Sequence, residues 1–127
     1  MIFLQHGLFD SADSFVYKPG LQSIGTYLAS QGHDVWLGNS RGNKYSHTHT
    51  DAGISDRMYF NFSLDEMARH DLPAVVRYIT ELTKGKIVYV GHSLGTTQMF
   101  AALADTVVND FLHSKIEVFI ALAPIVY

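Results

Sequence analysis

Cysteine is absent from the 127-residue sequence, which excludes disulfide bonds, thiolate metal ligands and a cysteine nucleophile. Long apolar runs are missing too: the longest, Val118 to Tyr127, is far shorter than the roughly 20 residues that a membrane-spanning helix needs. The first residues, Met1 to Leu4, lack the basic start, apolar stretch and cleavage site of a secretory signal. We therefore expect no membrane span, no leader, and a chain that starts directly in its first strand.

Basic charge is scarce as well, with nine Lys and Arg against twelve Asp and Glu, a net charge of -3 and a pI near 6.1. The nine cations are spread along the chain, so the sequence predicts no basic stripe for nucleic acid or anionic lipid. The composition is otherwise globular: 47% of the residues are hydrophobic, and no segment is biased enough to form a linker or a disordered tail. The sequence indicates a single domain that spans residues 1–127.

Short β-rich apolar runs alternate with longer helical patterns, which is typical of a parallel α/β sheet. Right-handed crossovers then predict four parallel strands in the order second, first, third, fourth, with helices on both faces. The strands are expected at residues 2–4, 34–37, 87–90 and 118–122. A helix is expected at about 19–31, closed by Gly32, and a long loop should follow the second strand up to residue 61. A further helix after residue 93 carries Met99, Leu103 and Val107 on one face.

Local signals predict helices with defined ends between residues 62 and 86. Ser63 and Glu66 form a capping box, which opens a helix at Leu64. Asp71 and Pro73 are then expected to break the helix and restart it. Gly85 is expected to close the restarted helix. The helix carries one apolar stripe, formed by Leu72, Val75, Val76, Ile79 and Leu82.

The sequence Gly91-His92-Ser93-Leu94-Gly95 follows the third β-rich run and precedes a helical pattern. This is the strand, G-x-S-x-G and helix context of a nucleophile elbow, in which a serine occupies a sharp turn. Glycines two residues before and after the serine give the crowded turn the room that it needs. We interpret Ser93 as a nucleophile, while the alternative is a serine that only caps the following helix.

Two backbone N–H groups are expected to stabilise the negative charge that develops on a substrate carbonyl. The helix after Ser93 points its free N–H groups and positive dipole end at the reacting centre, so the N–H of Leu94 is the first donor. The second donor should come from the loop after the first strand, where His6-Gly7-Leu8 would supply the N–H of Leu8. Gly7 would allow a close backbone approach, and the alternative is an ordinary turn at the end of a strand.

Seven histidines invite a search for a catalytic base or a metal site. His47 and His49 form the one close pair, and with no third ligand indicated we expect them to be exposed and to bind no metal. The side chain of His92 should point away from the nucleophile into a packing position. His6 is the one histidine that could approach Ser93, although a role in holding its own loop by hydrogen bonds is favoured.

Four blocks of the sequence resemble the acid lipase family, which includes gastric and lysosomal lipases. The most specific block is Asp-Val-Trp-Leu-Gly-Asn-Ser-Arg-Gly-Asn at residues 34–43, because generic hydrolases of the same fold do not share it. Within it, Arg41 is expected to anchor its loop through carboxylate or carbonyl oxygens. The other blocks are residues 3–8, 62–74 and 121–124.

The resemblance implies a partial α/β-hydrolase fold and hydrolysis of acylglycerols or sterol esters through an acyl-enzyme. It implies a lipid ester as substrate, contact with a lipid interface in the full-length form, and no metal or organic cofactor. Members of the family are often secreted or lysosomal. The implied site consists of Ser93 as nucleophile, Leu8 and Leu94 as oxyanion donors, and Gly7, Gly91, Gly95 and His6 as supporting residues.

The chain departs from the family's pattern in two ways. Relatives usually carry Gln at the position of Leu94, but the oxyanion donor there is a backbone N–H, so the oxyanion hole should survive. In this fold the triad runs Ser, Asp, His along the chain, so we expect the Asp, the His and the family's cap region to be missing. The chain is then either the nucleophile-bearing half of a serine ester hydrolase or a truncated homologue that binds partners through an apolar pocket and an open sheet edge.

Overall fold

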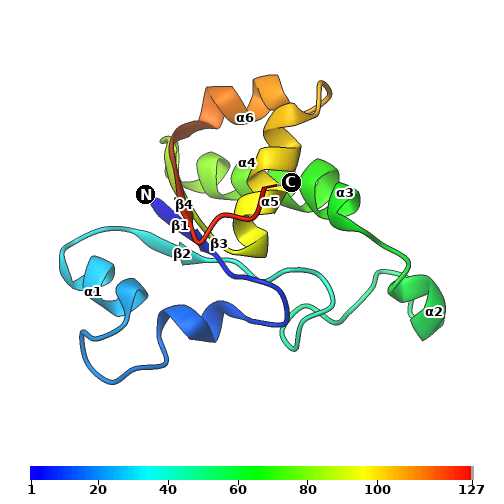
Figure 1. Ribbon diagram of the computed structural model, residues 1–127, viewed down its shortest axis with the longest axis horizontal. Coiled ribbons are helices and arrows are strands. Elements are labelled where there is room, and N and C mark those ends of the chain that lie inside the picture. The colour runs from blue at the N-terminus through cyan, green and yellow to red at the C-terminus, as the bar shows by residue number, and fades with distance from the viewer. Residues whose placement is uncertain (127) are drawn as a thin grey trace.

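Four parallel strands form the centre of the computed structural model, which describes residues 1–126 (Figure 1). They are β1 (Ile2–Gln5), β2 (Val35–Leu37), β3 (Ile87–His92) and β4 (Ile116–Leu122), in the spatial order β2-β1-β3-β4. The pairing is parallel throughout. The fold class, the pairing and the strand order that the sequence predicts are therefore confirmed.

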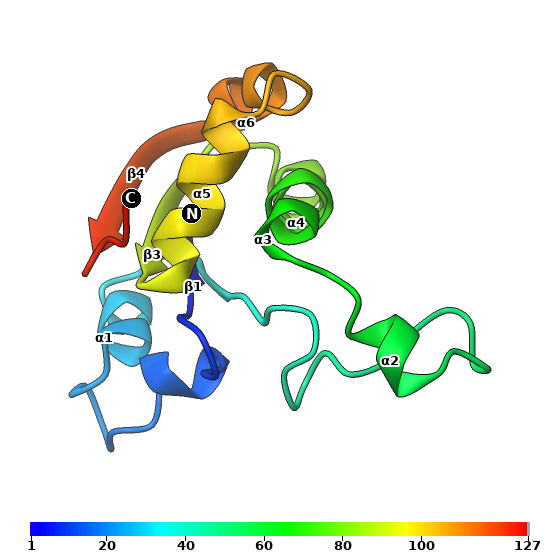
Figure 2. The same ribbon diagram turned by 45° about the vertical axis from the view of Figure 1, so that its right-hand side comes forward.

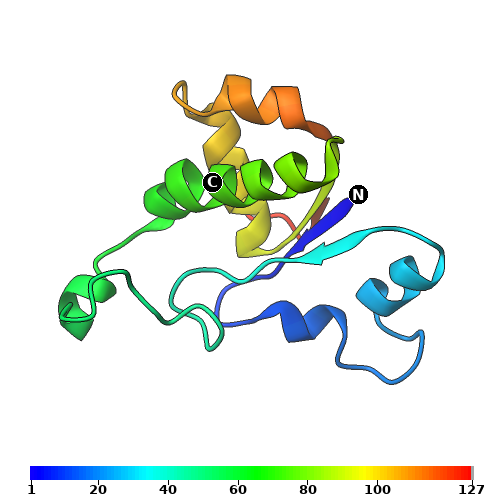
Figure 3. The ribbon, with the colours of Figure 1, turned by 180° about the vertical axis from the view of Figure 1, so that it is seen from behind.

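Helices cover both faces of the sheet, as predicted. On one face lie α4 (Leu72–Thr83), α5 (Leu94–Ala104) and α6 (Asn109–Lys115). The other face carries α1 (Ile24–Ser30) and the short 3-10 helix η1 (Ala12–Phe15), and Figure 3 shows the two layers from behind. The remaining helices are α2 (Asp56–Tyr59), which projects away from the sheet in Figures 1 and 2, and α3 (Leu64–Glu66).

The larger hydrophobic core lies between the sheet and the layer of α4, α5 and α6, with Tyr89 at its centre. The Tyr89 ring makes edge-to-face contacts with Phe3 and Phe119, at centroid distances of 5.4 and 5.6 Å. Its hydroxyl donates a hydrogen bond of 2.8 Å to the carbonyl of Gly95. Burial raises the pKa of the Tyr89 phenol well above its ordinary value. The neutral hydroxyl thus connects the centre of the core to the first turn of α5.

Two helix ends differ from the prediction. The helix α1 begins at Ile24, not near residue 19, because the backbone of Ser23 is extended (φ -99°, ψ 142°). The predicted left-handed glycine after α1 is present, since Gly32 has a φ of +85°. After α4 the left-handed residue is Lys84 (φ 59°), one position before the predicted Gly85, because the helix ends one residue earlier.

The helical segment from Leu64 to Thr83 is continuous, whereas the sequence predicts a break near Asp71 and Pro73. A π-helical turn at Met67–Asp71 joins α3 to α4. Leu72 keeps right-handed helical angles (φ -60°, ψ -48°) although it precedes a proline. A π turn shifts the hydrogen-bond register by one residue, which lets the helix pass a proline that has no N–H to donate.

Several apolar residues on the predicted helix stripes lie at the surface. In α4, Leu72, Val76 and Ile79 are buried, but Leu82 is exposed and Val75 reaches the boundary of exposure. Val107 is exposed because α5 ends before it, at Ala104. The chain then forms α6, which the sequence pattern does not predict because one buried side chain is too few to produce a periodic stripe. Likewise, α2 replaces part of the predicted loop.

The capping box at the start of α3 is confirmed, and it makes helix stability depend on pH. The Ser63 backbone N–H and hydroxyl donate to the Glu66 carboxylate at 2.6 and 2.7 Å. Led by the Ser63 hydroxyl, these bonds lower the pKa of Glu66 from 4.5 to about 2. Because the folded-state pKa is depressed, the stabilisation is present above pH 4.5 and is lost as the pH falls toward 2.

We expect Glu66→Gln to flatten the fall of the thermal midpoint between pH 4.5 and pH 2, which is the window that the shift defines. The measurement is thermal unfolding by circular dichroism at several pH values. Glu81→Gln is the control, because its carboxylate makes no ion pair with the residues that the structure describes. Equal slopes for the wild type and Glu66→Gln would contradict the prediction.

The edge strand β4 presents an apolar face on the α1 side of the sheet. Ile120 pairs with Val90, whose side chain belongs to the small core under α1, so Val118, Ile120 and Leu122 point to that side. These three side chains are 46%, 43% and 38% exposed. An exposed apolar edge strand is a template for pairing with other chains.

We expect the chain to self-associate in a concentration-dependent way through β4. Sedimentation velocity over a series of concentrations measures the association, and Ile120→Lys should reduce it by placing a charge on the open face. Val107→Lys is the matched control, because Val107 is an exposed apolar residue outside the sheet. A concentration-independent monomer would refute the prediction.

Candidate active site

Ser93 lies at the carboxyl end of β3, in the turn that leads into α5. Its backbone angles (φ 50°, ψ -116°) are ones that a residue with a side chain rarely adopts, at a cost of about 1–3 kcal/mol. Hydrogen bonds hold this conformation: the Ser93 N–H donates to the Leu122 carbonyl at 3.0 Å, and the Ser93 carbonyl accepts from the N–H and hydroxyl of Thr96 at 2.9 and 2.6 Å. The Ser93 hydroxyl makes no capping bond to α5, which disfavours a purely capping role.

Glycines make the turn at Ser93 sterically feasible. A Cβ atom on Gly91 would lie 2.7 Å from the carbonyl carbon and oxygen of Gly95, and one on Gly95 would lie 2.6 Å from the carbonyl oxygen of Gln5. Such distances are far inside van der Waals contact with backbone atoms that cannot move aside. Backbone from β1, β3 and α5 therefore packs together directly behind Ser93.

The loop after β1 meets Ser93 from the other side. A Cβ atom on Gly7 would lie 3.1 Å from the Cβ of Ser93, so the Gly7 backbone is in close contact with the serine. Leu8 and Leu94, whose N–H groups are the predicted oxyanion donors, line one cleft of about 210 Å³. The remaining lining is rich in apolar side chains and includes Phe9, Phe60, Phe62 and Met67.

His6 is buried next to this cleft, and both of its ring nitrogens are occupied. The backbone N–H of Ser40 donates to Nε2 at 3.0 Å, so Nε2 must be the unprotonated nitrogen. The proton then resides on Nδ1, which donates to the Gly7 carbonyl at 2.7 Å. The side-chain amide of Asn43 also lies 3.1 Å from Nε2. These contacts match the loop-holding role and leave no ring nitrogen free to accept a proton from Ser93.

The family-specific block at residues 34–43 surrounds His6. The Asn39 side-chain oxygen accepts from the Ala12 N–H at 3.1 Å and from the Asn43 amide at 2.8 Å. Through Asn43 and His6, this chain of hydrogen bonds connects the loop after β2 to the Gly7 carbonyl. Sequence alone could not find the Ala12–Asn39 and His6–Asn43 contacts, because these pairs are 27 and 37 positions apart along the chain.

Two further contacts fix the same block. The Ser40 hydroxyl accepts from the side-chain amides of Gln5 and Gln98 at 2.9 and 3.3 Å. Arg41 forms a two-point ion pair with Asp71, and this carboxylate raises the pKa of the Arg41 guanidinium. The expected anchoring of the Arg41 loop by a carboxylate is therefore observed, and the partner comes from the π-helical turn.

None of the other histidines forms a hydrogen bond with Ser93 in the part of the chain that the structure describes. His47 packs against the rings of Tyr59 and Phe60, with centroid distances of 4.9 and 5.4 Å. Within residues 1–126, no group of three or more His, Asp and Glu side chains could hold a metal ion. The prediction of a packing position for His92 is wrong. Its side chain is exposed, on the same side of the sheet as Val90.

No helix of the described residues is long and apolar enough to cross a membrane.

A glycine-flanked serine in a strained turn between a parallel strand and a helix is the geometry of the nucleophile elbow of α/β hydrolases. The family model described as the alpha/beta hydrolase fold matches residues 1–124. The chain therefore belongs to the alpha/beta hydrolase fold family.

Within this family the chain is similar to the acid lipases, as its sequence blocks suggest. It is 47% identical over 126 residues to lipase member K of Homo sapiens and 44% identical over 126 residues to gastric triacylglycerol lipase of Bos taurus. Each of these alignments covers 98% of the chain. It is 42% identical over 127 residues to lysosomal acid lipase/cholesteryl ester hydrolase of Macaca fascicularis, with 99% of the chain covered. The chain spans 31% of the length of each of these relatives.

Solved structures support the fold at lower identity. An extracellular alpha/beta-hydrolase from a Paenibacillus species matches 99% of this chain and 41% of its own, with a TM-score of 0.63 and 15% identity. A Bacillus licheniformis lipase in its mature form matches 97% of this chain and 40% of its own, with a TM-score of 0.61 and 17% identity. At these identities the likeness shows the shared fold alone.

Proposed function

We propose that this chain supplies the nucleophile and the oxyanion hole of a serine ester hydrolase that acts on lipid esters. The observation that carries the proposal is the strained backbone of Ser93, held at the end of β3 with the first N–H groups of α5 beside it. A protein maintains such strain where surrounding contacts overdetermine it, and sites of this kind are often functional. The lipase names of the relatives favour this proposal over a binding module.

The proposed reaction begins with attack of the Ser93 Oγ on the ester carbonyl carbon. The carbonyl π electrons move to oxygen, and the N–H groups of Leu94 and Leu8 stabilise that oxyanion. Collapse of the tetrahedral intermediate breaks the C–O bond to the leaving oxygen, which takes up the proton lost by Oγ and departs as the alcohol, and the acyl group stays on Oγ. Water then releases the fatty acid and regenerates the serine. A base must take the Oγ proton, and none of the hydrogen bonds at Ser93 among residues 1–126 involves its hydroxyl.

The cleft beside the nucleophile supports a lipid ester as the substrate. Phe60, Phe62 and Met67 give its wall an apolar character suited to an acyl chain. At its mouth, Leu8 is 60% exposed and Phe9 is 100% exposed, so both could contact a lipid interface without rearrangement. We propose triacylglycerols or sterol esters as the substrate class, in line with the names of the gastric and lysosomal relatives.

The test of this proposal is covalent labelling by an activated short-chain ester, p-nitrophenyl acetate, followed by intact-mass spectrometry. We expect the chain to gain one acetyl group slowly, because the oxyanion hole remains but no base assists. Ser93→Ala should remain unlabelled, while Ser114→Ala, which removes an exposed hydroxyl on α6, should react like the wild type. Equal labelling of the wild type and Ser93→Ala would overturn the proposal.

A further inference from the structure

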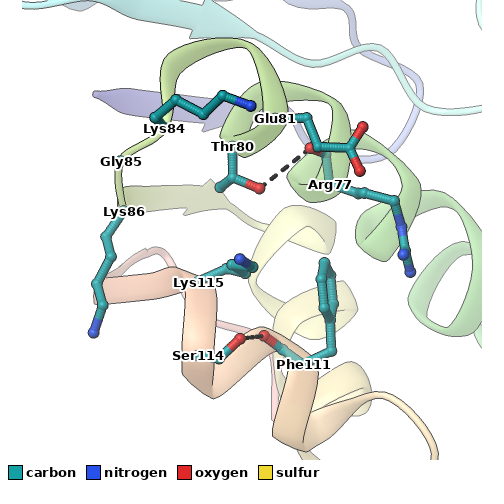
Figure 4. A pocket seen from close by; sticks show the side chains of 9 residues that line it. All are labelled: Arg77, Thr80, Glu81, Lys84, Gly85, Lys86, Phe111, Ser114 and Lys115. Carbon is teal, nitrogen blue, oxygen red and sulfur yellow. Dashed lines mark hydrogen bonds between the residues drawn. The ribbon is translucent and has the colours of Figure 1, made fainter.

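A hollow of about 460 Å³ opens near the amino end of β3, at the opposite end of this strand from the candidate active site (Figure 4). It lies between the end of α4, the turn that leads into β3, and the end of α6. Lys86 directly precedes β3, whereas Ser93 directly follows it, so the strand separates the two by about 20 Å. The hollow is thus independent of the cleft that contains Leu8 and Leu94.

Four cationic side chains line this hollow: Arg77, Lys84, Lys86 and Lys115. Three of the nine Lys and Arg residues in the chain form ion pairs, and these four belong to the six for which the described residues provide none. Glu81 is the one acidic residue in the lining. The fold therefore gathers positive charge that the sequence, with its dispersed cations, does not predict.

The orientation of these groups favours an anion held by charge. Figure 4 shows the ammonium group of Lys115 directed into the space between α4 and α6, while the Lys84 side chain lies along the last turn of α4 and Lys86 points outward. Arg77 lies over the Phe111 ring, with its guanidinium carbon 4.8 Å from the ring centroid, so its charge is held at the rim.

The hydroxyl groups in the lining have already used their protons. Thr80 donates to the Arg77 carbonyl at 3.2 Å, and Ser114 donates to the Phe111 carbonyl at 2.7 Å (Figure 4). Recognition of a ligand in this hollow must therefore come from the cations and not from hydroxyl donors.

Stabilisation of helix ends accounts for only part of this charge. A cation in the last turn of a helix offsets the negative end of the helix dipole, which explains Lys115 in α6 and Lys84 at the end of α4. Arg77 lies in the middle of α4, and Lys86 lies beyond the helix. Both are at the same hollow, where concave walls concentrate the field of all four cations.

We propose that this hollow binds a phosphate group that carries at least two negative charges. Lysine ammonium groups are effective phosphate ligands as point charges, and an arginine at the rim adds planar donors. The group could belong to a soluble phosphorylated compound or to the head group of a phosphorylated lipid. In both cases it binds away from the Ser93 chemistry.

The experiment uses the full chain and two probes. Inorganic pyrophosphate is titrated by isothermal calorimetry, and vesicles of phosphatidylcholine with and without phosphatidylinositol 4-phosphate are tested by flotation. The double variant Lys84→Gln/Lys115→Gln should weaken binding by about tenfold or more, because two of the four positive charges that line the hollow are removed. Lys18→Gln/Arg57→Gln, which removes the same net charge outside the hollow, should change it by less than about twofold.

Each outcome decides the proposal. Binding of pyrophosphate alone supports a soluble ligand, and binding only of vesicles with the phosphorylated lipid supports a head group. Equal losses of affinity in both double variants would show that binding depends only on the overall charge, and this result would overturn the proposal. A failure of the wild type to bind either probe would overturn it as well. Ser93→Ala should bind like the wild type, so this result does not depend on the proposed hydrolase function.

Discussion

The 127-residue chain alone is expected to hydrolyse emulsified triacylglycerol roughly 10⁶-fold more slowly than an enzyme with a complete triad, the loss seen when a triad base is removed. A neutral serine hydroxyl is a weak nucleophile without a positioned base. His6 directly precedes the loop that meets Ser93, and its two ring nitrogens are occupied by Ser40 and Gly7. The proposed oxyanion hole would then support slow acylation and no more.

The assay compares the wild type, Ser93→Ala and His6→Ala on an activated short-chain ester and on emulsified triacylglycerol. Multiple turnovers of triacylglycerol that disappear in Ser93→Ala would mean that a base exists within these 127 residues. Loss of that turnover in His6→Ala as well would identify His6 as the base. With the expected result, His6→Ala alters only the slow acylation, because the loop that contains Gly7 loses its support.

Replacement of Gly95 by alanine should destabilise the fold, although alanine is the better helix former. A Cβ there would lie 2.6 Å from the Gln5 carbonyl oxygen and 3.0 Å from that of His6. Overpacking of this kind costs about 3 kcal/mol. Alanine is favoured over glycine inside helices by about 1 kcal/mol, so a net loss would show that crowding exceeds the helix preference.

Urea unfolding of Gly95→Ala and of Gly53→Ala measures this effect. Gly53 is the matched control, since a Cβ there meets nothing closer than a side-chain oxygen of Asp51 at 3.4 Å. Its replacement should change the free energy of unfolding by less than about 0.5 kcal/mol. If Gly95→Ala proves as stable as the wild type, the backbone behind Ser93 is not packed as described.

The sequence predicts those features that arise from neighbours along the chain. The capping box at Ser63, the turn at Ser93 and the strands β1 and β3 depend on short local patterns, and all of them are present. The sequence is less informative where contacts between distant residues contribute. The π turn ends at Asp71, which pairs with Arg41 30 positions away, and the exposure of His92 depends on how the helices cover the sheet.

The same reason explains what the sequence does not reveal about the two sites. The partners of the His6 Nε2 atom, Ser40 and Asn43, lie 34 and 37 positions away along the chain, so no local pattern could assign its tautomer. The second hollow is assembled from α4, the turn after it and α6, and α6 itself is not predicted. The catalytic roles of Ser93, Leu8 and Leu94 remain proposals that the labelling experiment tests.

Two groups of residues line the cleft, and they are held in different ways. Hydrogen bonds from Asn39 through Asn43 to His6 fix one group, whereas the other consists of the aromatic rings of Phe60 and Phe62. The block at residues 34–43 holds the loop that contains Gly7 in place, so under the proposed function its hydrogen bonds are needed whichever ester is used. Phe60 and Phe62 come from the segment between α2 and α3, and both rings pack against Gly42 of this block without joining its hydrogen bonds. Under the proposed function, substitutions at Phe60 and Phe62 that keep this packing can change substrate preference without breaking the hydrogen bonds that hold the loop.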